Sequence, residues 1–121
     1  MLEKFLRSLV RGLIGVTHVI RSEMNMRIHL AAAVAVVVTG FVFELAAWEW
    51  VSVLLCVGLV LSAECMNTAL ERLADRVSLD WHPLIKQAKD CAAGAVLVLA
   101  VMAAVVGGIV FLPRIRALTG W

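Results

Sequence analysis

The chain has 121 residues, a formal net charge of +2 and a hydrophobic content of 63%, with a mean hydropathy of +0.97. A chain this short and this apolar cannot hide its hydrophobic surface in a soluble core, so the composition excludes a small soluble domain and indicates a membrane protein. The small net charge, without a basic stripe carrying interleaved aromatic residues, gives no indication of nucleic-acid binding.

The first predicted element is an amphipathic helix over about residues 2–22. Its apolar residues recur at helical spacing, and charged and polar residues occupy the other face. Basic side chains on such a face suit an anionic membrane surface, although a helix that covers the membrane bundle would need much the same pattern. We favour the surface position. Charged residues interrupt this segment, so no signal peptide is evident.

Three further segments are apolar enough to cross a bilayer, which needs about 20 helical residues. They cover about residues 28–47, 48–70 and 91–112. Lys and Arg gather before the first span and between the second and third, and none lies between the first and second. The positive-inside rule therefore predicts that the N-terminus and the second loop are cytoplasmic. No internal repeat or long linker divides the chain, so we expect one domain over residues 1–121.

The loop before the third span contains a structural break at Pro83. A residue before proline avoids the helical conformation, and proline suits the first helical turn, so a new helix is expected to begin there. Its first turns carry Lys86, Lys89 and Asp90. Together with the free backbone N–H groups of a helix start, these residues make a phosphate site plausible; a solvated helix start is the alternative reading.

A row of polar side chains at the end of the second span is the main functional indication: Glu64, Asn67, Glu71 and Asp75. At about 100° per residue, all four share one helix face. Ionisable groups at membrane depth are rare and usually face a partner or a cavity, so the row predicts a functional site. Glu64 lies deepest, near the cytoplasmic face, and Glu23 stands at the same level before the first span.

These residues predict phosphoryl transfer from a nucleotide to a lipid hydroxyl. Mg²⁺ commonly takes one or two carboxylates plus substrate phosphates, and Glu23 and Glu71 could supply them while Lys89 neutralises phosphate charge. Glu64 is the natural base, because a partly desolvated carboxylate is a better proton acceptor. The sequence contains no GxxxxGK[ST] motif, so the predicted nucleotide site is not a P-loop.

Other readings of the same residues remain open. Glu71 and Asp75 could simply pair with nearby basic residues, and Glu23 with Arg27 at helical spacing. For Glu64, function is favoured over a buried structural hydrogen bond. A small proton-coupled transporter is the alternative function, but its acidic group should lie near the midplane with a cavity opening to either side. A purely structural protein would need no acidic row.

Two segments carry a resemblance to a known family. Residues 63–71 (AECMNTALE) with Asp75, and residues 88–95 (AKDCAAGA), resemble the signature of the small bacterial diacylglycerol kinase and undecaprenol kinase family. The resemblance extends over nearly the whole chain. Residues 23–29 and 81–83 look more like the undecaprenol kinase branch.

The resemblance implies an all-α integral protein of the bacterial cytoplasmic membrane, a homotrimer with one surface helix and three spans per subunit. Its composite sites would lie between subunits, and small residues such as Ala31–Ala33 would allow close helix approach. The implied activity is an ATP- and Mg²⁺-dependent kinase of a membrane lipid alcohol, undecaprenol being favoured over diacylglycerol.

The family motif also implies roles for individual residues. Glu64 corresponds to the catalytic base that meets the lipid, and Asn67 belongs to the catalytic set. Glu23 and Glu71 correspond to the metal-binding glutamates. The implied nucleotide-binding residues are Glu23, Glu71, Asp75, Asp80, Trp81, His82, Lys89 and Asp90.

Overall fold

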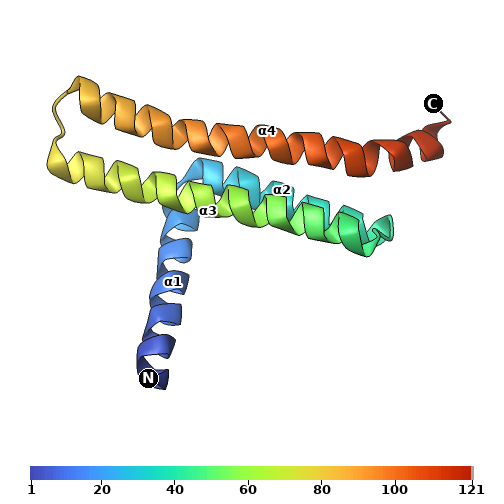
Figure 1. The fold of residues 1–121 in the computed structure, drawn as a ribbon, viewed down its shortest axis with the longest axis horizontal. Coiled ribbons are helices and arrows are strands. Elements are labelled where there is room, and N and C mark those ends of the chain that lie inside the picture. The colour runs from blue at the N-terminus through green and yellow to red at the C-terminus, as the bar shows by residue number, and fades with distance from the viewer. Residues whose placement is uncertain (121) are drawn as a thin grey trace.

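The computed structural model in Figure 1 describes residues 1–120 as four helices with short connections. They are α1 (Leu2–Ser22), α2 (Met24–Val42), α3 (Ala47–Val77) and α4 (Pro83–Thr119). Helices α2, α3 and α4 lie side by side, with α3 in contact with both neighbours, and α1 extends away to one side of them (Figure 1). Helices α2, α3 and α4 are long and apolar enough to cross a membrane.

The helix bounds refine the predicted elements. Helix α1 matches the helix expected over residues 2–22, and the predicted helix start at Pro83 is confirmed. The predicted spans 48–70 and 91–112 lie inside longer helices, because a hydropathy pattern marks the apolar stretch while the helix continues into polar sequence. The bounds predicted for the span over 28–47 lie too far along the chain, because α2 begins at Met24 and ends at Val42.

A tight turn over residues 43–46 explains the early end of α2. Glu44 adopts a left-handed backbone with φ of 53°, which a helix cannot continue. The N–H of Leu45 then bonds the carbonyl of Gly40 at 3.1 Å, and the N–H of Ala46 bonds the Glu49 carboxylate at 2.8 Å. That second bond satisfies one of the free N–H groups at the start of α3.

A buried hydrophobic cluster lies near this turn. Leu45, Val53 and Val110 form the buried cluster, which joins α3 and α4 to the turn. A Cβ on Gly40 would come within 2.7 Å of Cη2 of Trp50, so glycine lets the tryptophan ring lie directly on α2. Most other large apolar side chains of the three long helices face outward. Such a surface suits contact with lipid or with further protein.

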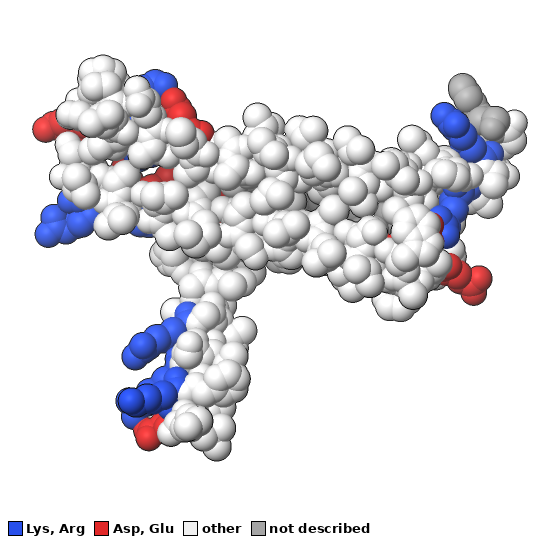
Figure 2. Space-filling model, viewed as in Figure 1, with Lys and Arg blue, Asp and Glu red and all other residues white. Residues whose placement is uncertain are grey.

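An ion pair closes the same end of the bundle. The two terminal nitrogens of Arg114 on α4, Nη1 and Nη2, each donate to the Glu49 carboxylate at 2.6 Å, and Nη1 also donates to the carbonyl of Val110 at 2.9 Å. The side chain of Glu49 is only 8% exposed. Figure 2 shows charged residues gathered at the two ends of the bundle and along α1, with an uncharged surface between them.

Candidate functional site

All four residues of the predicted acidic row lie on α3, at the end of the bundle from which α1 extends. Glu64 is fully buried, whereas Asn67, Glu71 and Asp75 are half-buried. The row therefore runs from a position shielded from solvent to positions that a water-soluble ligand can reach.

Glu64 has a basic neighbour on another helix. Nε2 of His29 on α2 lies 3.2 Å from Oε1 of Glu64, and the two side chains are 24% and 3% exposed. No separate role was predicted for His29 from the sequence. The available signal was a single histidine among the apolar residues of a predicted span, which is rarely without a polar partner.

Asn67 lies one helical turn beyond Glu64. Among the interactions of residues 1–120, its buried Oδ1 has no hydrogen-bond donor. A buried acceptor without a donor is destabilising, because it has lost its bonds to water without replacement. The site beside Glu64 therefore offers an oxygen that is available to a ligand or to another chain.

Glu23 lies at the junction of α1 and α2, where extended backbone separates the two helices. Its Oε1 accepts a hydrogen bond from Nη2 of Arg72 at 2.8 Å. The alternative pairing with Arg27 is not formed, since Arg27 instead donates to the carbonyl of Arg21 at 3.1 Å. Because Arg72 follows Glu71 in the chain, the ion pair brings the Glu23 junction to the turn of α3 that carries Glu71.

The start of α4 completes this end of the bundle. Nζ of Lys89 lies 2.5 Å from Oδ1 of Asp75, which joins α4 to the acidic row. Nζ of Lys86 lies 2.5 Å from Oδ2 of Asp90 one turn along the same helix. Lys89 and Asp75 thus form one of the ion pairs that the sequence left open.

The loop residues predicted to meet the nucleotide are exposed: Asp80, Trp81 and His82. Trp81 has 77% of its surface accessible. His82 has a local role as well, because its Nδ1 accepts a hydrogen bond from the N–H of Leu84 at 3.2 Å and caps α4. The helix start was predicted from the sequence, but this cap was not.

The carboxylates fit a metal that is bound together with phosphates. Within residues 1–120, no three His, Cys, Asp or Glu side chains are grouped as a metal site. Glu23 and Glu71 provide hard oxygen donors on segments that the Arg72 ion pair holds together. Since Mg²⁺ commonly uses one or two carboxylates and completes its octahedron with water and substrate phosphates, this donor set suits a Mg²⁺–nucleotide complex.

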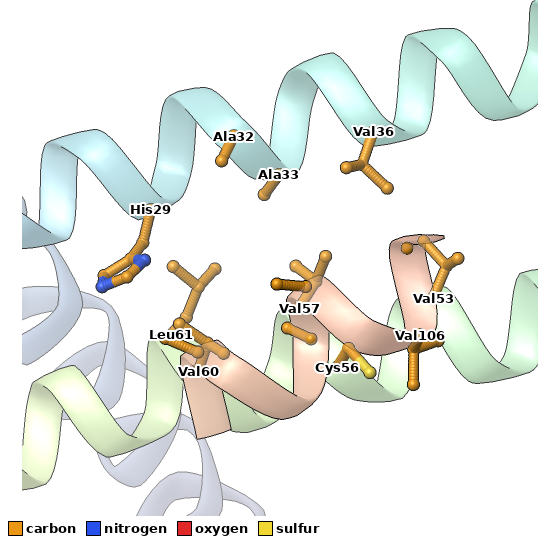
Figure 3. A pocket seen from close by; sticks show the side chains of 14 residues that line it. His29, Ala32, Ala33, Val36, Val53, Cys56, Val57, Val60, Leu61 and Val106 are labelled. Carbon is orange, nitrogen blue, oxygen red and sulfur yellow. The ribbon is translucent and has the colours of Figure 1, made fainter. Parts of the chain in front are cut away.

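An apolar groove extends along the bundle to His29, the neighbour of Glu64. It has a volume of about 340 Å³ and is lined by α2, α3 and α4. Figure 3 shows His29 at one end of it, with alanine and valine side chains along its length. A groove of this kind can accept a hydrocarbon chain but provides few hydrogen-bonding partners away from its His29 end.

Together, three apolar helices and a set of carboxylates at one end define an integral membrane protein with a site at the boundary of its apolar region. The family model for prokaryotic diacylglycerol kinase matches residues 11–111. The chain belongs to this family, as the resemblance in the motifs predicted.

The individual relatives support the same family assignment. The chain is 42% identical to an undecaprenol kinase of Bacillus subtilis over 114 residues, which cover 94% of this chain and 93% of the relative. It is 41% identical to a diacylglycerol kinase of Synechocystis, with 86% and 60% of the two chains covered. A diacylglycerol kinase of Pseudomonas aeruginosa is 31% identical, with 78% and 76% covered.

The protein is accordingly an enzyme of a lipid kinase family, a phosphotransferase with an alcohol acceptor. The transporter alternative gains no support from these relatives.

Proposed function

We propose that the protein transfers the γ-phosphate of ATP, with Mg²⁺, to the hydroxyl of a membrane lipid, undecaprenol before diacylglycerol. The observation that carries the proposal is the buried carboxylate of Glu64 beside the end of an apolar groove. The preference for undecaprenol is supported by the full-length similarity to the Bacillus subtilis undecaprenol kinase.

In this proposal Glu64 is the catalytic base. It accepts the proton of the lipid hydroxyl while the hydroxyl oxygen bonds the γ-phosphorus and the bond from that phosphorus to the β-γ bridging oxygen breaks, releasing ADP. The apolar groove and the burial of Glu64 exclude water, which would otherwise compete with the lipid as acceptor. The free Oδ1 of Asn67 accepts a hydrogen bond beside the reacting groups.

The nucleotide occupies the more exposed part of the site. Glu23 and Glu71 would hold Mg²⁺, which supplies neutralisation of phosphate charge when bound. Arg72 fixes the Glu23 carboxylate for this role. Lys89 leaves its ion pair with Asp75 and binds a phosphate of the nucleotide. Asp90 lies beside it on the same helix. The exposed loop places further contacts against the nucleotide, from Asp80, Trp81 and His82.

The proposal includes a membrane arrangement for one lipid kinase domain, residues 1–121. The N-terminus and the 78–82 loop face the cytoplasm, and α1 lies on the inner surface of the bacterial cytoplasmic membrane. Figure 2 supports this position, because the basic side chains of α1 lie on one side of it. The outward-facing apolar residues of α2, α3 and α4 leave room for assembly into a homotrimer with composite sites.

The activity is tested with purified protein in bilayers that contain undecaprenol or diacylglycerol at equal mole fraction. With Mg²⁺ and ATP labelled in the γ-phosphate, we expect label in both lipids and faster labelling of undecaprenol. Label in neither lipid would contradict the kinase proposal. Faster labelling of diacylglycerol would reverse the proposed preference.

Replacing Glu71 by glutamine is expected to raise the Mg²⁺ concentration needed for half-maximal activity by about tenfold or more, since a neutral amide is a weaker ligand for a hard cation. The measurement is initial rate against free Mg²⁺ at saturating lipid. Glu44→Gln is the matched control, because Glu44 lies in the turn at the opposite end of the bundle. An unchanged Mg²⁺ dependence in Glu71→Gln would remove Glu71 from the proposed metal site.

A further inference from the structure

We propose that His29 is a positioning residue for Glu64, holding Oε1 of the carboxylate so that Oε2 faces the lipid hydroxyl. This inference rests on the proposed kinase function and adds a residue from a different helix to its site. Its geometric basis is the 3.2 Å distance between Nε2 of His29 and Oε1 of Glu64.

The burial of Glu64 makes such a partner necessary. Its side chain is 3% exposed, and within residues 1–120 His29 is the basic side chain in ion-pair contact with it. An ionised carboxylate removed from water is stable only when it is paired or hydrogen-bonded. An imidazole with its proton on Nε2 meets this need at one oxygen and leaves the second oxygen to accept a proton.

The carboxylate also needs a partner to fix its orientation. The last torsion of a glutamate side chain has broad minima, so the position of the reacting oxygen is poorly defined by the helix alone. A displacement of about 1 Å from the reactive geometry can lower a rate by about 10²-fold. His29 is attached to α2, whereas Glu64 is attached to α3, so the contact fixes the carboxylate from across the helix interface.

The location of His29 connects the base with the groove. His29 is part of the groove lining, at the end shown in Figure 3, and most of the remaining lining is apolar. A lipid whose chain occupies the groove would therefore bring its hydroxyl to the His29 and Glu64 pair. Other contacts hold α2 against α3, namely Gly40 with Trp50 and the ion pair of Glu23 with Arg72. Loss of the imidazole should then affect the reaction more than the fold.

The test compares two replacements of His29 in bilayers with saturating lipid. His29→Leu removes the donor, and we expect kcat to fall about 10- to 100-fold while KM for ATP stays within about twofold. His29→Gln places an N–H group near the position of Nε2, and we expect it to recover most of the lost kcat. Val38→Leu is the control for a conservative change in α2, because Val38 is exposed and lies outside the groove lining, and its kcat should stay within about twofold of the wild type.

Equal losses in the leucine and glutamine variants, or wild-type kcat in His29→Leu, would overturn the inference. If His29→Leu fails to assemble, ¹⁵N-histidine spectra decide the matter. The Nε2 signal of His29 should shift between wild type and Glu64→Gln, while those of His18 and His82 stay fixed. An unmoved His29 signal also overturns the inference. Absence of lipid labelling by the wild type would instead count against the kinase function.

Discussion

Replacing Glu64 by glutamine is expected to lower kcat by about 10³-fold, because general base catalysis typically contributes about 10²- to 10⁴-fold and an amide cannot accept the proton. Glutamine keeps the shape of glutamate and its hydrogen-bonding capacity, and the site is already buried. We therefore expect the variant to assemble normally. The measurement is kcat for lipid phosphorylation, together with size-exclusion chromatography in detergent.

Glu44→Gln provides the comparison, since it makes the same chemical change in the exposed turn between α2 and α3. Its kcat should remain within about twofold of the wild type, as for a surface substitution remote from the reaction. Wild-type turnover in Glu64→Gln would make Glu64 a structural residue and would require another acid as base.

Replacing Arg114 by methionine is expected to cause the largest loss of stability among the substitutions considered. The change leaves the carboxylate of Glu49 without its two guanidinium bonds at a position where the side chain is only 8% exposed. Removing one partner of a buried ion pair lowers stability more than replacing both partners by apolar residues, because an uncompensated charge remains. We expect the thermal unfolding midpoint in detergent to fall by roughly 5–10 °C.

A second substitution separates the effect of the unpaired charge on Glu49 from the effect of the lost hydrogen bonds. Adding Glu49→Gln to Arg114→Met removes the charge while keeping an oxygen that can bond the N–H of Ala46. The thermal unfolding midpoint of the double variant should therefore lie between those of Arg114→Met and the wild type. Arg116→Met tests the same replacement at an exposed position two residues further along α4 and should change little. If Arg116→Met lowered the midpoint as much as Arg114→Met, the ion pair would not be the cause.

The features that the sequence predicted well are local. Pro83 determines the start of α4 through its own backbone restrictions, and the spacing from Glu64 to Asp75 places the acidic row on one helix face. The spans were likewise evident from composition. Their ends were less accurate near residue 43, because no hydropathy pattern reveals that Glu44 adopts a left-handed conformation.

The contacts that the sequence could not predict join distant parts of the chain. Glu23 and Arg72 are 49 residues apart, and Glu49 and Arg114 are 65 apart. Helical spacing offered Arg27 as an alternative partner for Glu23, but at the break between α1 and α2 the carboxylate contacts Arg72 on α3 instead. The pairing of His29 with Glu64 likewise depends on how α2 packs on α3. Subunit number and orientation across the membrane remain predictions.

Two ion pairs lie at opposite ends of the bundle, Glu49 with Arg114 and Glu23 with Arg72. The distance between them relates the protein to the thickness of its membrane. Along α3, the paired residues Glu49 and Arg72 are separated by about 35 Å at the usual helical rise, slightly more than the roughly 30 Å hydrocarbon core of a bilayer. A rigid bundle of this length meets hydrophobic mismatch in thinner or thicker membranes. In the proposed kinase, the depth of Glu64 relative to the lipid hydroxyls would then vary with the acyl-chain length of the host bilayer.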